Sequence, residues 1–178
     1  MRKIIYYVAA ALDGFISGQD GNISGFAQGG SGVDQYLQDL KDYDIVIMGR
    51  KTYEFGYAFG LKPGRPAYPH MQHYIFSNTL KFDEPHEQVK IHPPDLNIIR
   101  ELKAGEGSDI YLCGGGIFAG WLLDNELIDT LKVKINPLIL GQGVRLFGDS
   151  KKTIRLALTE HQKYDGGLQI ITYRIDYT

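Results

Sequence analysis

Three consecutive glycines, Gly114 to Gly116, separate an apolar run from a stretch with helical spacing in the segment DIYLCGGGIFAGWLL. Where a strand leads into a helix, glycines permit positive φ angles and let a ligand approach the backbone closely. The free N–H groups at the start of the following helix attract an anion. A pyrophosphate group meets these requirements, so we expect a dinucleotide to bind at this turn.

A second interpretation of the glycines stays open on this motif alone. Gly114, Gly116 and Ala119 match the G-x-G-x-x-A form of the dinucleotide fingerprint. However, the turn lies late in the chain, and the next apolar strand does not end in the acidic residue that a Rossmann site uses for its ribose. Glycines that only allow tight packing of a strand against a helix would give the same pattern.

Two further turns have the composition of a phosphate site. In DIVIMGRKTYE, Gly49 precedes Arg50 and Thr52, so a cation, a hydroxyl and backbone N–H groups can converge at a helix start. In IFSNT, a strand ends in Ser77 and Asn78, which suit a ribose or a phosphate, or only cap a turn. Together, the three turns predict a nucleotide site more firmly than any one of them.

Strand-like and helical stretches alternate along the chain and must position these turns. Strands are expected over 3–10, 44–49, 73–78, 88–92, 109–113, 129–140, 154–165 and 168–178, and helices over 33–43, 50–59, 95–105 and 117–127. A long glycine-rich loop is expected over 12–32, and loops of that length are usually functional. The DGG triplet at 165–167 predicts a hairpin turn.

This alternation predicts an α/β fold with a mixed, mostly parallel sheet flanked by helices and an antiparallel C-terminal hairpin. A chain of 178 residues can bury one core, so we expect a single domain over residues 1–178. In such sheets, ligands bind beyond the carboxyl ends of the strands. All three turns lie at such ends.

Composition and charge exclude several classes of protein. The net charge of −2 comes without a basic stripe, so no nucleic-acid partner is expected. Cys113 is the only cysteine, which excludes an internal disulfide and a Cys-rich zinc site and fits a cytoplasmic setting. The five histidines lack metal-ligand spacing, so we predict no metal.

No apolar run approaches the roughly 18 residues of a membrane span, and we expect no membrane partner. The beginning, MRKIIYYVAAAL, has features of a short signal peptide. Its Ile, Tyr and Val residues are also typical of a buried strand, which is the interpretation we favour.

Five segments in the same order over nearly the whole chain resemble the dihydrofolate-reductase-like superfamily: YYVAAALDGFISG, IVIMGRKTYE, IFSNT, YLCGGGIFAGWLL and VKINPLILGQGVRLF. Within it, the chain is most similar to the riboflavin-biosynthesis reductase branch, the family of the C-terminal domain of the bifunctional deaminase-reductase. The resemblance implies a dihydrofolate-reductase-like fold that binds NADPH across the strand ends. It also implies hydride transfer to a pterin- or pyrimidine-like ring and, as in many members, a homodimer.

The resemblance assigns the cofactor site residue by residue. Ala9 and Ala10 lie along the nicotinamide; Gly49, Arg50, Lys51 and Thr52 hold phosphates; Ser77 and Asn78 hold the adenosine end with its 2′-phosphate; Gly114, Gly115, Gly116 and Ile117 form the pyrophosphate turn and the helix start.

Two carboxylates are the predicted catalytic residues. Asp13 faces the substrate in the resemblance, although an Asp-Gly pair can also simply form a turn. Asp34 occupies the counterpart of the carboxylate that holds the pterin in dihydrofolate reductases and assists its protonation, or it only caps a helix. Either carboxylate, or an ordered water, could supply the proton that accompanies hydride transfer.

The chain also departs from its relatives. The first loop lacks the Pro-Trp pair of dihydrofolate reductases, which disfavours folate reduction. Ala11 stands where the riboflavin branch commonly has a serine, and the cysteines that the fused deaminase needs for zinc are absent.

We therefore predict a stand-alone NADPH-dependent reductase of a heteroaromatic substrate, similar to 5-amino-6-(5-phosphoribosylamino)uracil reductase. Three alternatives stay open. The chain could reduce dihydrofolate or a pterin, it could bind NADPH or a pterin without turnover, or it could be an assembly unit that dimerises through its strand-rich last third.

Overall fold

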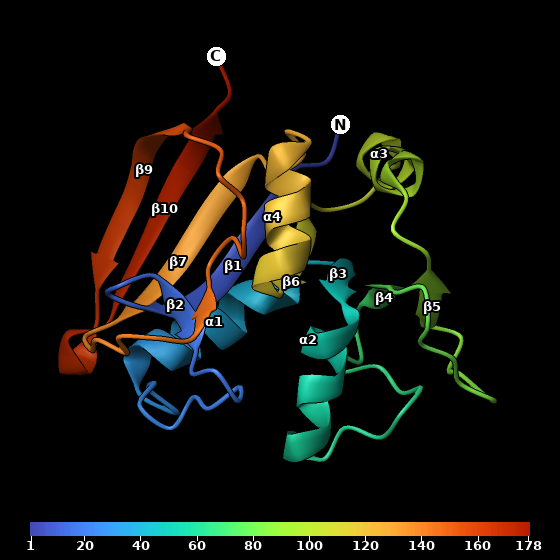
Figure 1. Ribbon diagram of the computed structural model, residues 1–178, viewed down its shortest axis with the longest axis horizontal. Helices are drawn as coiled ribbons and strands as arrows, with labels where there is room; N and C mark the ends of the chain where they lie inside the picture. The colour runs from blue at the N-terminus through green and yellow to red at the C-terminus, as the bar shows by residue number, and fades with distance from the viewer.

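The computed structural model describes all residues from Met1 to Thr178 and is built around one eight-stranded sheet. Its strand order is β5-β4-β3-β6-β1-β7-β10-β9 (Figure 1). The strands are β1 (Ile4–Ala11), β3 (Ile45–Gly49), β4 (Gln72–Phe76), β5 (Val89–His92), β6 (Ile110–Gly114), β7 (Thr130–Asn136), β9 (Arg155–Lys163) and β10 (Gln169–Asp176). The helices are α1 (Ser31–Asp39), α2 (Arg50–Phe55), α3 (Leu96–Ala104) and α4 (Gly116–Asp124).

Six neighbouring strands, from β5 to β7, run parallel to one another. Only β10 runs antiparallel to its neighbours β7 and β9. The predicted α/β fold with a mostly parallel sheet and an antiparallel C-terminal hairpin is confirmed. The carboxyl ends of the six parallel strands meet at one edge of the sheet, because parallel strands share a direction.

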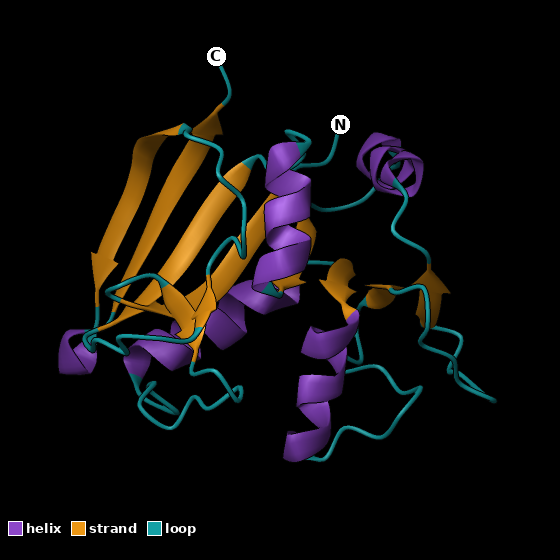
Figure 2. Cartoon of the chain, in the orientation of Figure 1, coloured by secondary structure: helices purple, strands orange, loops and turns teal.

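Helices cover both faces of the sheet, as Figure 2 shows for strands and helices in separate colours. In Figure 1, α1 lies behind the sheet and α4 in front of it. One core joins Ile99 of α3 and Leu122 of α4 to Ile4 and Leu112 of the sheet. The other core, on the α1 face, joins Tyr7 and Tyr111 of the sheet to Tyr53 of α2, with Tyr36 of α1 packed against it.

The predicted loop over 12–32 contains structure that the sequence pattern does not show. Phe15–Ser17 form β2, which pairs antiparallel with β8, a strand of two residues at Val144–Arg145. Helix α1 begins at Ser31, inside the predicted loop. Strands this short have no periodic signal. Gly143 permits the pairing, since a Cβ at that position would lie 2.0 Å from the Ser17 carbonyl oxygen.

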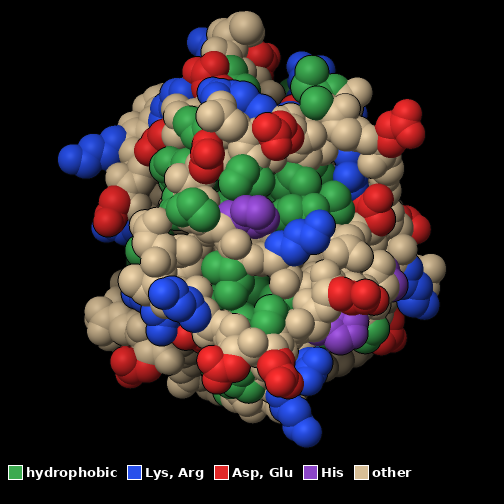
Figure 3. Space-filling view, turned by 90° about the vertical axis from the view of Figure 1, so that its right-hand side faces the viewer, with side chains coloured by type: hydrophobic (Ala, Val, Ile, Leu, Met, Phe, Trp, Pro, Cys, Tyr) green, Lys and Arg blue, Asp and Glu red, His purple; other side chains and the backbone are tan.

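The aromatic side chains near β4 and β5 form a continuous row. His92 stacks on Tyr74 with ring centroids 5.7 Å apart and lies 6.2 Å from Phe76. Phe76 stacks on Phe118 of α4 at 5.1 Å, and Phe118 on Trp121 at 5.7 Å. Figure 3 views the molecule from this side and shows apolar side chains gathered around a histidine. The row links β5 to the helix that follows the glycine turn.

His73 is fully buried in β4 as a neutral ring. Its Nδ1 lies 3.0 Å from the Met71 carbonyl oxygen, and its Nε2 accepts the Tyr68 N–H at 3.1 Å. This arrangement requires the proton on Nδ1. Burial lowers the pKa of His73 to about 4.

We expect the free energy of unfolding to fall by roughly 3 kcal/mol between pH 6.5 and 4, where the unfolded chain binds a proton at position 73 and the folded protein does not. Urea unfolding at pH 7, 5.5 and 4.5 measures this slope. H73N, although less stable at pH 7, should have a flatter slope, and H161Q, at an exposed position on β9, should keep it. Equal slopes for H73N and the natural chain would contradict the assignment.

Candidate functional site

The predicted phosphate turns come together at the carboxyl edge of the sheet. They follow β3, β4 and β6, which are adjacent in the order β4-β3-β6. The Thr52 hydroxyl at the start of α2 lies against the glycine turn, because a Cβ built on Gly115 would be 3.0 Å from Thr52 Oγ1. Residues from two turns more than 60 positions apart in the sequence thus share one surface.

Arg50 joins the second turn to the third. Its guanidinium donates to Thr79 Oγ1 at 2.7 Å and to Glu54 Oε1 at 2.8 Å, and its side chain remains 44% exposed. Ser77 Oγ accepts the N–H groups of Thr79 and Leu80, so it caps the turn after β4. The cation is therefore held beside the 77–79 turn and is still open to a ligand, and the neighbouring Lys51 and Asn78 are also exposed.

The three glycines have different roles. Gly114 has φ +125°, and the peptide bond that joins it to Gly115 is cis. Around Gly115, only Thr52 Oγ1 lies within 4 Å of a built Cβ, so the backbone there is open to a ligand. A Cβ on Gly116 would lie 2.1 Å from the Arg145 carbonyl oxygen, and one on Gly120 would lie 2.3 Å from that of Phe147. Gly116 is therefore required by the packing of α4 against residues 145–148.

The start of α4 suits an anion. The helix has nine residues, no side chain caps it, and its first turn contains no acidic residue. Its first N–H groups therefore lack intrahelical partners and carry the positive end of the helix dipole. Ile117, in the first turn, is 70% exposed and adds an apolar surface beside these groups.

The two alanines predicted to lie along the nicotinamide point to opposite faces of β1. Ala10 is buried in the core on the α4 face, whereas Ala9 is only half-buried on the α1 face. Ala9 pairs with Lys134 of β7, and their side chains therefore share a face. Ala9 presents only a methyl group on this face.

The structure does not assemble the two predicted catalytic carboxylates into one site. Asp13 accepts the N–H of Gly141 at 2.7 Å and that of Leu140 at 3.1 Å. These bonds hold the pKa of the Asp13 carboxyl below its ordinary value, so Asp13 anchors the segment after β7 as an ionised group. Asp34 lies on the exposed side of α1, and its side chain makes no hydrogen bond. The bonds to Asp13 do not favour proton donation by that carboxyl.

Sequence reasoning missed a polar group on the α1 face of the sheet. The Tyr36 and Tyr111 hydroxyls lie 2.7 Å apart, and Tyr68 Oη is 3.7 Å from Cys113 Sγ. Burial raises the pKa of these three phenols and of the thiol. Beside them, Lys134 Nζ lies 4.4 Å from the centre of the Tyr36 ring. No motif in the sequence indicates this cluster.

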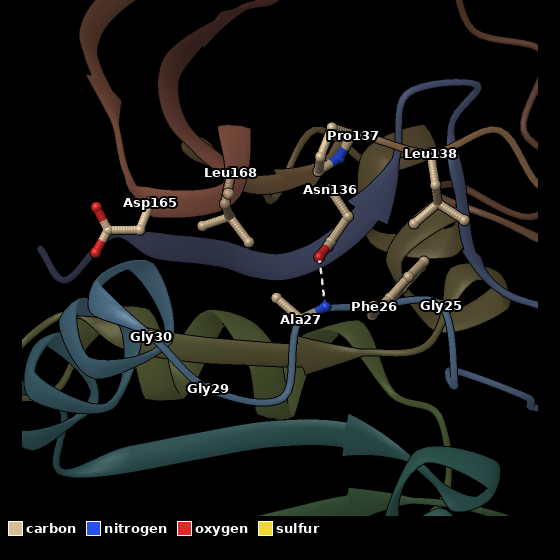
Figure 4. A pocket seen from close by; sticks show the side chains of 11 residues that line it. Gly25, Phe26, Ala27, Gly29, Gly30, Asn136, Pro137, Leu138, Asp165 and Leu168 are labelled. Carbon is tan, nitrogen blue, oxygen red and sulfur yellow. Dashed lines mark hydrogen bonds between the residues drawn. The ribbon is translucent and has the colours of Figure 1, made fainter.

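A cavity of about 370 Å³ opens at the same edge of the sheet, at the end of β7. It is lined by the segment before α1, the residues after β7 and the turn between β9 and β10 (Figure 4). The buried Asn136 holds this lining together, because its Oδ1 accepts the Ala27 N–H at 2.8 Å, drawn as a dashed line in Figure 4. A cavity of this volume has room for a small molecule.

The side chains show no grouping of three or more His, Cys, Asp or Glu residues that could hold a metal ion. In addition, none of the helices has the length and apolar character needed to cross a membrane.

Comparison with known proteins places the chain within one family. The model of the RibD C-terminal domain matches residues 2–170. Among curated proteins, the uncharacterized protein YwjB of Bacillus subtilis (strain 168) is 27% identical over 172 residues, which cover 95% of this chain and 96% of YwjB.

Solved structures share the fold along the chain. A candidate riboflavin biosynthesis protein of Shewanella sp. PV-4 has a TM-score of 0.80 and 23% identity, with 99% of each chain covered. The Thermotoga maritima diaminohydroxyphosphoribosylaminopyrimidine deaminase/5-amino-6-(5-phosphoribosylamino)uracil reductase has a TM-score of 0.71 and 16% identity, over 98% of this chain and 57% of that one. Dihydrofolate reductase of Enterococcus faecalis, complexed with NADP(H), has a TM-score of 0.67 and 16% identity, over 98% and 96% of the chains.

Proposed function

Because the chain belongs to the RibD C-terminal domain family, we propose that it is an NADPH-dependent reductase that transfers a hydride to a pyrimidine- or pterin-like substrate. The observation that carries this proposal is the convergence of Arg50, Thr52 and Gly115 at one edge of the sheet. Two structural relatives support it: the Thermotoga maritima protein reduces a phosphoribosylaminouracil, as its name states, and the Enterococcus faecalis protein was solved with NADP(H).

The residues at the three turns fit this cofactor. The open backbone at Gly115 and the uncapped start of α4 would hold the pyrophosphate. The Thr52 hydroxyl adds a donor, and Arg50 beside the 77–79 turn would hold the 2′-phosphate. The exposed Ile117 offers apolar contact at the helix start.

When bound, NADPH supplies the hydride, and the chain's task is to orient the two rings and exclude water. Ala9 presents only a methyl group on the α1 face, and we place the flat ring beside it. Tyr36 and Tyr111 lie on this face, and one hydrogen bond joins their hydroxyls. The substrate proposed by similarity is 5-amino-6-(5-phosphoribosylamino)uracil or a related pyrimidine, and dihydrofolate is the competing substrate in a turnover assay.

Arg50→Ala should weaken NADPH binding on the order of 10- to 100-fold and NADH binding less than about threefold, because a charge-assisted bond to phosphate contributes roughly 1.5–3 kcal/mol. Titration of purified protein with each nucleotide measures this, by quenching of protein fluorescence and by the shift in melting temperature. Arg100→Ala, at an exposed position on α3, is the matched control. Equal losses for NADPH and NADH would contradict a 2′-phosphate contact, and no binding of either nucleotide would remove the reductase proposal.

A further inference from the structure

We propose that Lys134 binds the substrate, through a carbonyl or anionic oxygen on a flat heterocycle that lies between α1 and the sheet. The inference rests on the proposed reductase function and deepens it, because it assigns a residue to substrate recognition and sets which rings the site accepts.

Lys134 is a buried cation without an anionic partner. The residue is 7% exposed, and its ammonium makes no hydrogen bond and no ion pair with the chain; its one polar contact is the Tyr36 ring at 4.4 Å. Burying an ammonium in this way is unfavourable unless an anion or an acceptor compensates it. Burial lowers the pKa of Lys134, which reflects the same cost.

The ammonium can still be reached. Only His92 Nε2 and Thr172 Oγ1 are side-chain polar atoms that are both fully buried and without a hydrogen-bond partner. Lys134 Nζ, which also lacks a partner, therefore keeps some contact with solvent. A ligand that displaces this solvent can supply the missing acceptor.

Lys132 shows what a structural lysine on this surface looks like. It precedes Lys134 by two positions on β7 and so lies on the same face. Its ammonium pairs with Asp39 Oδ2 at 2.7 Å and lies 4.7 Å from the centre of the Tyr7 ring. Both lysines thus have an aromatic ring, but only Lys132 has a carboxylate. The difference indicates that the partner of Lys134 is not part of the chain.

The position of Lys134 fits a substrate contact. It pairs with Ala9, the half-buried alanine that we place beside the nicotinamide. Asn136, which lines the cavity at the end of β7, follows it by two residues on the same face, a spacing of about 7 Å along a strand. The lysine is therefore the next residue on this face of β7 before the cavity-lining Asn136, and it lies beside the proposed hydride-transfer position.

The charge determines the chemistry of the ligand. A buried ammonium favours an oxygen acceptor or an anion and disfavours an amino group or a cation. Asp34, the predicted carboxylate for an amino-substituted ring, lies on the exposed side of α1. The site should therefore accept pyrimidines that keep the ring carbonyl oxygens of uracil, and reject 2,4-diaminopyrimidines, in which amino groups replace those oxygens.

Calorimetric titration with two single-ring probes, barbiturate and 2,4-diaminopyrimidine, tests this inference, with and without NADPH. The natural chain should bind the anionic barbiturate at least tenfold more tightly than the diamine. Lys134→Met should lose at least tenfold in barbiturate affinity and lose the preference, Lys134→Arg should retain the preference, and NADPH affinity should be the same in all three proteins.

Thermal unfolding separates recognition from a structural role. Lys134→Met should melt at the same temperature as the natural chain or higher, since it removes an uncompensated charge. Lys132→Met should melt lower, because it leaves Asp39 without its cation, yet keep the probe preference. Barbiturate binding that survives in Lys134→Met, a lower melting temperature for that variant, or no preference in the natural chain would overturn the proposal. Failure of NADPH binding alone would instead overturn the reductase function, since the probes are also titrated without nucleotide.

Discussion

Replacing Gly116 by alanine should lower the free energy of unfolding by about 3 kcal/mol or more, which is the upper range for overpacking a buried site. The added Cβ would lie 2.1 Å from the Arg145 carbonyl oxygen and 3.1 Å from the Gly148 nitrogen. Both neighbours are backbone atoms and cannot rotate away. The Leu146 N–H donates to the Gly14 carbonyl at 3.0 Å and the Leu146 carbonyl accepts the Tyr6 hydroxyl at 3.0 Å, so this segment is anchored from two sides.

Urea unfolding of G116A beside the natural chain measures this effect. Gly29→Ala is the matched control, because nothing lies within 4 Å of its built Cβ and its φ is not positive. That control should change stability by less than about 1 kcal/mol, in the stabilising direction, by restricting the unfolded chain. A G116A protein that unfolds at the same urea concentration as the natural chain would contradict this prediction, because the backbone of residues 145–148 would then have moved to accommodate the added Cβ.

Replacing Gly115 by alanine should weaken cofactor binding and leave the stability of the fold unchanged, in contrast to the substitution at Gly116. Gly115 has φ −88°, which an alanine adopts without strain. The only atom near the built Cβ is the hydroxyl of a side chain, Thr52 Oγ1 at 3.0 Å. The methyl group would, however, occupy the surface on which we place the pyrophosphate. We expect NADPH affinity to fall on the order of 100-fold, about 2.7 kcal/mol, which is within the range for one hydrogen bond to a charged group.

Nucleotide titration and urea unfolding of G115A, in parallel, test this expectation. Unchanged stability with lost binding supports the open backbone at Gly115 as the phosphate contact. NADPH binding equal to that of the natural chain would place the pyrophosphate elsewhere. The pair G115A and G116A thus separates the two interpretations of the glycine run, ligand approach and tight packing.

Sequence alone could not show which glycine serves ligand approach and which serves tight packing. Both interpretations require the same thing, a residue without a side chain, and the pattern contains no information on what fills the space. The structure shows a carbonyl oxygen at Gly116 and open surface at Gly115. The fold class was accessible, by contrast, because apolar runs and helical spacing alternate on both sides of each turn.

Lys134 illustrates a second limit. In the segment LKVKIN, lysines alternate with apolar residues, which is typical of a strand with one face in solvent. The structure covers that face with α1, whose residues precede β7 by about a hundred positions. Which face of a strand a distant helix covers is decided by the topology of the chain. The local pattern therefore predicts the strand but contains no information on the environment of its lysines.

The place of β1 in the sheet also affects how the chain can fold as it is synthesised. This first strand lies between β6 and β7, which are made more than a hundred residues later. Until then, only β3, β4 and β5 can pair with final neighbours, and β1 has no neighbouring strand. Such distant pairing slows folding and prolongs exposure of apolar surface. The proposed nucleotide site, at the ends of β3, β4 and β6, is therefore completed only after most of the chain has been synthesised.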